Sequence, residues 1–176
     1  MTEITMTVMV TEASAADEPV LQHMVQLYTH DFSELWAGTD RGDLLPDGRF
    51  AAYALEEYWT RPAWRAMLLW CNGRLAGFAL VNDGGHSGEP TDCNMAEFFV
   101  LRKYRRQGVG RLAAEAIFSQ MPGRWEVAVA RKNTDALAFW RRTIEGAAGI
   151  TGTYEIDVNN DKWNGQIIRY NIPACR

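Results

Sequence analysis

Ten residues near the middle of the chain combine the charges and glycines that could hold a polyphosphate. Five of them are arginine or lysine, and the segment reads Arg102-Lys103-Tyr104-Arg105-Arg106-Gln107-Gly108-Val109-Gly110-Arg111. An apolar run over 95–101 precedes this segment, and a helix-patterned run over 112–118 follows it. In such an order, glycines let the main chain approach a ligand and the helix start offers unpaired N–H groups. The segment therefore predicts a site for a compact polyphosphate.

Charge is distributed unevenly along the 176 residues. The net charge is -4, whereas the segment 102–111 carries +5 and the rest of the chain therefore carries -9. A general nucleic-acid binder has basic character over a wide face, so this localisation favours one small anionic ligand. Two alternatives stay open for the segment: a basic turn that only caps a helix, and a site for polyanions in general.

Composition indicates a single globular domain over 1–176, because the chain is long enough for a core and 47% apolar. Its three cysteines are an odd number at unrelated spacings, which argues against a disulfide framework. No uncharged apolar stretch approaches the roughly 18 residues that a membrane helix needs. The N-terminus also lacks the basic start of a secretory signal. We expect a cytoplasmic monomer or homodimer without membrane contact.

Apolar periodicity and turn residues predict the order of the elements. The Asn72-Gly73 pair predicts a tight hairpin between two strands. Strands are expected over 4–10, 66–71, 74–81, 95–101, 125–130, 152–158 and 165–172. Helices are expected over 17–32, 50–59, 112–120 and 133–142.

This order of elements, together with two motifs, resembles the GNAT N-acetyltransferases, which use acetyl-coenzyme A. The run from Arg105 to Gly110 fits the family's Arg/Gln-x-x-Gly-x-Gly/Ala pyrophosphate loop. A second block of the family, a helix opened by Asn and ending near an aromatic, is matched by Asn133, Ala136, Phe139 and Trp140. The resemblance implies an α/β (α+β) GNAT fold, with a central, mixed, mostly antiparallel twisted sheet of about seven strands and about four helices.

The resemblance also implies how acetyl-CoA would be held. Arg105 and Arg106 would pair with phosphate oxygens, while main-chain amides line the pyrophosphate. These amides are those of Gln107, Gly108, Val109, Gly110 and Arg111. The strand that ends at Val100 would splay away from the next strand. Main-chain groups of Phe99 and Val100 would then be free to pair with the pantetheine arm like an added strand, with the Val100 N–H directed at the thioester oxygen. The side chain of Arg111 could instead be solvated, and Asn133 could either touch the cofactor or cap its helix.

Acyl transfer to an amine requires the neutral amine, and an alkylammonium with a pKa of about 10.4 is charged at pH 7. Glu97 is the candidate general base, acting through water, because an apolar strand raises the pKa of a carboxyl group. The alternative is a Glu97 carboxylate paired with an arginine or facing solvent.

Trp140 departs from the family pattern, in which many members carry a tyrosine that protonates the departing thiolate. An indole N–H donates a hydrogen bond but is not a useful proton donor. Trp140 is then either a cofactor contact or a core aromatic. The departing thiolate would then be protonated by Tyr104, Tyr154, Tyr170 or water, or would leave without a proton donor.

The resemblance implies that two loops, 31–48 and 159–164, cover the acceptor pocket, and Trp36 and Trp163 could supply its apolar walls. Five acids make a cationic amine plausible, on a small molecule or a peptide: Asp31, Glu34, Asp40, Asp43 and Asp47. No metal is expected, because His23 and His30 have no matched ligand cluster. The sequence thus predicts an N-acetyltransferase that acts by direct attack in a ternary complex. The alternative is a coenzyme A-binding module without turnover.

Overall fold

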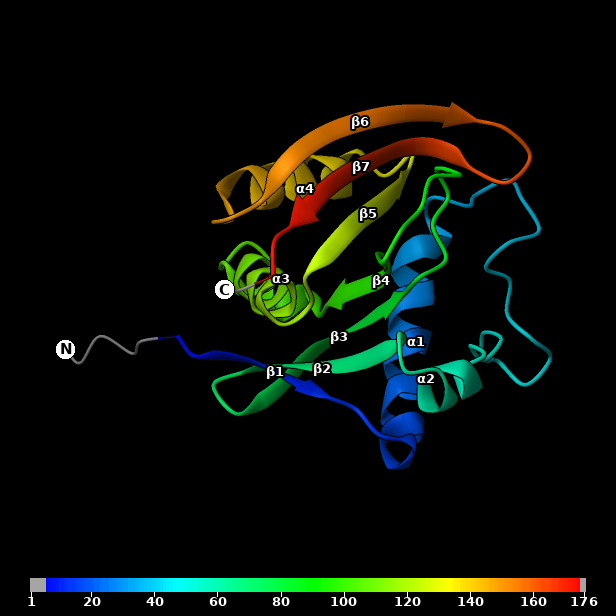
Figure 1. The fold of residues 1–176 in the computed structure, drawn as a ribbon. Coiled ribbons are helices and arrows are strands. Elements are labelled where there is room, and N and C mark those ends of the chain that lie inside the picture. Colours follow the sequence, from blue (N-terminus) through cyan, green and yellow to red (C-terminus); the bar gives the residue numbers. More distant parts are fainter. Residues whose placement is uncertain (1–5, 175–176) are drawn as a thin grey trace.

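A computed structural model describes residues 6–174, which form one seven-stranded sheet in the order β1-β2-β3-β4-β5-β7-β6 (Figure 1). The strands are β1 (Val8–Glu12), β2 (Arg65–Cys71), β3 (Arg74–Asn82), β4 (Cys93–Val100), β5 (Gly123–Ala130), β6 (Thr151–Asn159) and β7 (Asn164–Ile172). The helices are α1 (Glu18–Ser33), α2 (Glu56–Thr60), α3 (Val109–Gln120) and α4 (Thr134–Gly146). Only β4 and β5 pair in parallel, so the predicted mixed, mostly antiparallel GNAT fold is confirmed.

Alternation along the strands builds two apolar cores, one on each face of the sheet. In β2, Met67 and Leu69 pack into the core beneath α3 and α4, whereas Ala66 and Leu68 pack beneath α1. Figure 1 shows α3 and α4 on one side of the sheet and α1 and α2 on the other. No helix within residues 6–174 is long and apolar enough to cross a membrane.

The second predicted helix, 50–59, is wrong over its first half, since α2 begins only at Glu56. Two glutamines of α1 bind the main chain of the preceding segment instead. Gln26 donates to the Phe50 carbonyl and accepts from the Phe50 N–H, at 3.2 and 2.8 Å. Gln22 does the same for Tyr53, at 2.7 and 3.1 Å. These contacts satisfy main-chain groups that a helix would otherwise pair.

The first strand also begins later than predicted, at Val8, and the predicted positions 4 and 5 lie outside the described residues. The Asn72-Gly73 turn between β2 and β3 is confirmed, with both residues at positive φ, 49° and 72°.

The strands β4 and β5 separate after a short paired stretch. Their register contains two pairs, Cys93 with Trp125 and Asn94 with Glu126. Beyond Asn94 the β5-facing edge of β4 is therefore unpaired with a strand up to Val100. This confirms the expected splay and leaves an open main-chain edge that runs toward the start of α3.

Candidate active site

The basic segment forms a tight loop between β4 and α3. Arg106 and Gly108 both adopt left-handed backbone conformations, with φ of 61° and 85°. The first hydrogen bond within α3 runs from the Leu112 N–H to the Gly108 carbonyl, at 3.0 Å. The amides of Val109, Gly110 and Arg111 have no acceptor inside the helix, as expected of a first turn. The loop therefore presents a concave set of N–H groups at the positive end of a helix, which suits a phosphate.

Gly110 brings the first turn of α3 close to the end of β4. A Cβ atom there would lie 3.2 Å from Cε2 of Phe139 and 3.6 Å from Cγ2 of Val100. The absence of a side chain at Gly110 therefore lets the start of α3 pack closely against Phe139 and Val100. The first amides of α3 thus lie beside the last residue of β4.

Three polar side chains of the loop, those of Gln107, Arg111 and Arg106, differ in their partners. Gln107 donates to the Lys103 carbonyl at 2.7 Å, which closes the loop on itself. Arg111 pairs with Glu115 one helical turn later, at 2.7 Å, so its side chain lies on the outer face of α3. The exposed Arg106 guanidinium has no hydrogen-bond or ion-pair partner within residues 6–174.

Arg105 does not lie as the sequence predicted. Its Nε donates to the Val100 carbonyl at 2.6 Å, and its Nη2 donates to Asp31 on α1. Two of its three nitrogens are thus held by protein groups, whereas Arg106 keeps its guanidinium available. Asp31 also accepts from Arg102 at 2.8 Å. Burial raises the pKa of Asp31, but the hydrogen bonds from Arg105 and Arg102 outweigh burial and lower it.

The main chain at the end of β4 corrects a second prediction. The Leu101 N–H donates to the Ala76 carbonyl at 2.8 Å, and Phe99 stands opposite Phe78. Since antiparallel pairs alternate, the main-chain groups of Phe99 point toward β3 and are not free. Those of Phe98 and Val100 point to the open edge. The open edge of β4 is therefore formed by main-chain groups of Phe98 and Val100 rather than by those of Phe99.

Glu97 lies two residues before Phe99, on the face of the sheet that α1 covers. The Tyr28 hydroxyl of α1 donates to its Oε2. Burial raises the pKa of Glu97 to about 7, against the lowering effect of hydrogen bonds from Tyr28 and Tyr53. No arginine pairs with Glu97 among the described residues. The alternative in which an arginine pairs with the Glu97 carboxylate is therefore not present in the described structure. The raised pKa of Glu97 is that of a base that works near neutrality.

The second motif fits its structural roles. Asn133 caps α4, accepting from the Ala136 N–H at 3.2 Å. Trp140 is only 5% exposed and packs edge-on against Phe98, with ring centroids 5.0 Å apart. Trp140 is therefore a core aromatic behind the open edge of β4.

Three tyrosines are candidates to protonate the leaving thiolate, and their positions in the chain separate them. Tyr170 stands opposite Trp125, and Tyr154 stands opposite Arg169, both at the paired end of β4 and β5. The Tyr154 hydroxyl is also committed to Glu89, at 2.6 Å. Tyr104 lies four residues after the open end of β4, in the short helical turn Arg102–Tyr104, and is the one of the three on that side of the strand.

The acidic segment 31–48, which includes the end of α1, is partly neutralised by arginines. Asp31 binds Arg102 and Arg105, and Asp47 binds Arg49. In the second loop, Trp163 stacks on His86 with centroids 4.5 Å apart. The indole nitrogen of Trp163 is buried without a hydrogen-bond partner in the described part of the chain.

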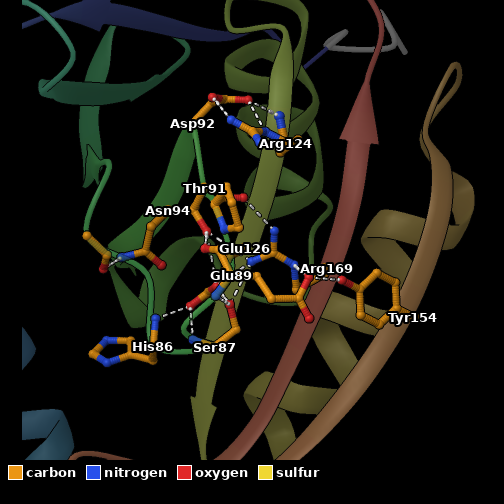
Figure 2. A network of polar contacts seen from close by, with 12 residues as sticks. His86, Ser87, Glu89, Thr91, Asp92, Asn94, Arg124, Glu126, Tyr154 and Arg169 are labelled. Atoms are coloured by element: carbon orange, nitrogen blue, oxygen red, sulfur yellow. Dashed lines mark hydrogen bonds and ion pairs between the residues drawn. The ribbon is translucent and has the colours of Figure 1, made fainter.

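A buried ion pair that the sequence did not predict lies beside the paired end of β4 and β5 (Figure 2). Glu126 of β5 and Arg169 of β7 meet at 2.8 Å, with side chains 0% and 6% exposed. Ser87 donates to Glu126 at 2.6 Å, and Arg169 donates to the Pro90 carbonyl at 2.9 Å. The pair thus holds the segment 83–92 against the sheet. The available signal was one charged residue in the apolar alternation of each strand.

Comparison with known proteins agrees with this geometry. None of the curated proteins compared with the chain matches it. A GNAT-family acetyltransferase from Staphylococcus aureus has a TM-score of 0.61 at 15% identity, over 94% of this chain and 99% of its own. An acetyltransferase from Thermus thermophilus has a TM-score of 0.59 at 17% identity, over 96% and 97%. The protein yncA from Salmonella typhimurium, solved with acetyl-CoA, has a TM-score of 0.55 at 13% identity, over 93% and 91%.

No cluster of metal-binding side chains occurs within the described range 6–174. At the level of sequence, residues 21–144 match the model of the Acetyltransferase (GNAT) family. This match spans more than half of the chain and includes β4, the basic loop and α4. The chain therefore belongs to the acetyltransferase (GNAT) family and is an acyltransferase.

Proposed function

We propose that the protein transfers the acetyl group of acetyl-CoA to a primary amine by direct attack in a ternary complex, in the cytoplasm. The observation that carries the proposal is Glu97, a carboxyl group with a pKa of about 7 on the strand that ends at the open edge. Family membership and a similar fold solved with acetyl-CoA support acetyl-CoA as the donor.

The donor would lie across the basic loop and the open edge of β4. The amides of Val109, Gly110 and Arg111 would receive the diphosphate, with the Arg106 guanidinium beside them. The close packing of Gly110 against Val100 supports this arrangement, because it places the first turn of α3 beside the end of β4. When bound, acetyl-CoA supplies an activated acetyl thioester. The Val100 N–H would donate to the oxygen on which charge develops during attack.

Glu97 would accept the proton of the amine. An amine with a pKa of about 10.4 is nearly all protonated at pH 7, so a base of matched pKa raises the reactive fraction. Burial against α1 and the phenols of Tyr28 and Tyr53 would keep the carboxyl group in place. A thiol with a pKa of about 8.5 leaves tolerably well as the thiolate, and Tyr104 would be the tyrosine that protonates it.

The acceptor would be a cationic amine, on a small molecule or a peptide. Glu34, Asp40 and Asp43 carry no arginine or lysine partner in the described structure and lie in the loop that follows α1. Their charge would attract a cation before it reaches Glu97.

Calorimetry with acetyl-CoA, followed by an amine panel read as thiol release, tests the proposal. We expect saturable binding and turnover with at least one cationic primary amine. Tight binding without turnover across amines and pH values would instead assign a coenzyme A-binding module. Salt-dependent binding of DNA that CoA fails to displace would assign a polyanion site.

A further inference from the structure

The side chain of Arg105 spans two elements that are distant in the sequence. Its Nε holds the carbonyl of Val100, the last residue of β4, at 2.6 Å. Its Nη2 reaches Asp31, near the end of α1. The guanidinium carbon also lies 5.7 Å from the Phe99 ring centroid. Arg105 therefore ties the end of β4 to α1.

Asp31 is better shielded than its partners. Its side chain is 16% exposed, against 41% for Arg105 and 69% for Arg102. Both arginines donate to this one carboxylate, and the Arg102 bond measures 2.8 Å. A single exposed ion pair contributes little to stability. A shielded carboxylate that accepts from two arginines can, however, fix the positions of both guanidinium groups.

The carbonyl that Arg105 holds is on the open edge. Because Phe99 pairs with β3, alternation directs the Val100 carbonyl and N–H toward the space left by β5. A charged hydrogen bond to that carbonyl fixes the final peptide unit of the edge. It also occupies one of the two lone pairs of that carbonyl, while the Val100 N–H is directed to the open edge as a donor.

We propose that Asp31 and Arg105 are positioning residues that fix the end of β4 for the pantetheine arm, and that phosphate binding by side chains falls to Arg106. This inference rests on the proposed function, since it assumes that CoA is the ligand. It assigns to α1 a role on the donor side, in addition to the contact that Tyr28 of the same helix makes with Glu97.

The test compares the affinities of CoA and of its nucleotide half, adenosine 3′-phosphate 5′-diphosphate, by calorimetry. The variants are Arg105→Gln, Asp31→Asn, their combination and Arg106→Gln. Glu155→Gln is the control, because it breaks a two-bond ion pair with Arg141, at 2.8 and 2.7 Å, between α4 and β6. Thermal unfolding of each variant shows that the fold is kept.

We expect Arg105→Gln and Asp31→Asn each to weaken CoA about tenfold, as the loss of a charged hydrogen bond does. Both should keep nucleotide affinity within about twofold, a difference below about 0.5 kcal/mol on the scale of binding. The combined variant should be no weaker than either single variant, because both changes remove one interaction. Arg106→Gln should weaken both ligands, and the control should weaken neither.

Two results would overturn the inference: loss of nucleotide affinity in Arg105→Gln to the extent seen in Arg106→Gln, or unchanged CoA affinity in Asp31→Asn. Neither would affect the proposed function, since the unaltered protein would still bind CoA. If the unaltered protein binds no CoA, the proposed function itself fails.

Discussion

The hydroxyl of Tyr28 donates a hydrogen bond to Oε2 of Glu97, although the two residues lie 69 positions apart. Tyr28 is 7% exposed and lies on α1, which covers the face of the sheet from which Glu97 projects. The same helix supplies Asp31 for Arg105 three residues later. One face of α1 therefore contacts both the candidate base and the basic loop.

The activity of the protein should depend on the ionisation of Glu97. A base must be deprotonated, so the rate at saturating acetyl-CoA should rise through about pH 7. Glu97→Gln should lower the rate by about a hundredfold or more, the usual effect of losing a general base. This loss should shrink at alkaline pH, where the amine is already neutral. A loss that is uniform across pH would indicate that Glu97 has a structural role only.

Tyr28→Phe should move the same pH limb to higher pH. The Tyr28 hydrogen bond lowers the pKa of Glu97, whereas burial raises it. Removing the hydrogen bond should therefore raise the pKa of Glu97 further. Tyr58→Phe is the matched control, because the Tyr58 hydroxyl accepts from Asn82 at 3.3 Å and does not bond to Glu97. Steady-state rates from about pH 5.5 to 9 define the pH–rate profile of each variant. Measurements every half pH unit or so are enough to detect a change of about one unit in the apparent pKa. An unmoved limb in Tyr28→Phe would contradict the assignment of this pH limb to Glu97.

Glu97 should also make the protein less stable as pH rises. Its folded pKa of about 7 exceeds the ordinary value of 4.5, so the folded state holds a proton that the unfolded state releases between these values. Stability is therefore lost as pH increases through this window. The shift corresponds to about 3 kcal/mol at most. Glu97→Gln should accordingly be more stable than the unaltered protein at pH 8, and the gain should vanish near pH 4. Urea unfolding at the two pH values measures the difference.

Gly108→Asp should abolish CoA binding while the fold persists. Gly108 lies at φ 85°, and a Cβ atom added there would have only Cε of Met6 within 4 Å, at 3.8 Å. The added carboxylate would therefore stand at the loop rather than in the core. Gly149→Asp controls for backbone strain, since Gly149 has φ 82° and no neighbour within 4 Å of such a Cβ atom. Calorimetry with CoA should show loss of binding in the first variant alone. Retained affinity in Gly108→Asp would contradict the phosphate role of the loop.

Local patterns were enough to predict much of the fold. Alternating apolar residues and the Asn72-Gly73 turn predicted the strands β2 and β3, and the glycines of the basic loop predicted the start of a helix. Each of these patterns depends on residues that are close together in the chain, so it can be recognised from the sequence alone. The order of the elements and the family resemblance that it supports were sufficient to predict that β4 and β5 separate.

Contacts between distant segments set the limits of prediction. Nothing near Phe50 shows that Gln26 of α1 occupies its N–H and carbonyl, so the pattern there suggested a helix. Similarly, Arg105 is part of a phosphate motif by sequence, whereas its partner Asp31 lies 74 positions away. The orientation of Phe99 depended on its register with β3, which composition does not fix.

Breaking the Glu126–Arg169 pair should destabilise the fold much more than breaking the Asp92–Arg124 pair, which Figure 2 shows in the same view. Arg169→Met would leave the fully buried Glu126 carboxylate without its cation, which costs about 3–5 kcal/mol when a buried pair is broken. Arg124→Met should cost much less, because both side chains of that pair are about half exposed, at 51% and 44%. Adding Glu126→Gln to Arg169→Met should recover part of the loss, since the uncompensated charge is then removed. Urea unfolding of the four proteins at pH 7 measures these differences, and equal losses for the two arginine variants would show that burial does not decide the contribution of the pair.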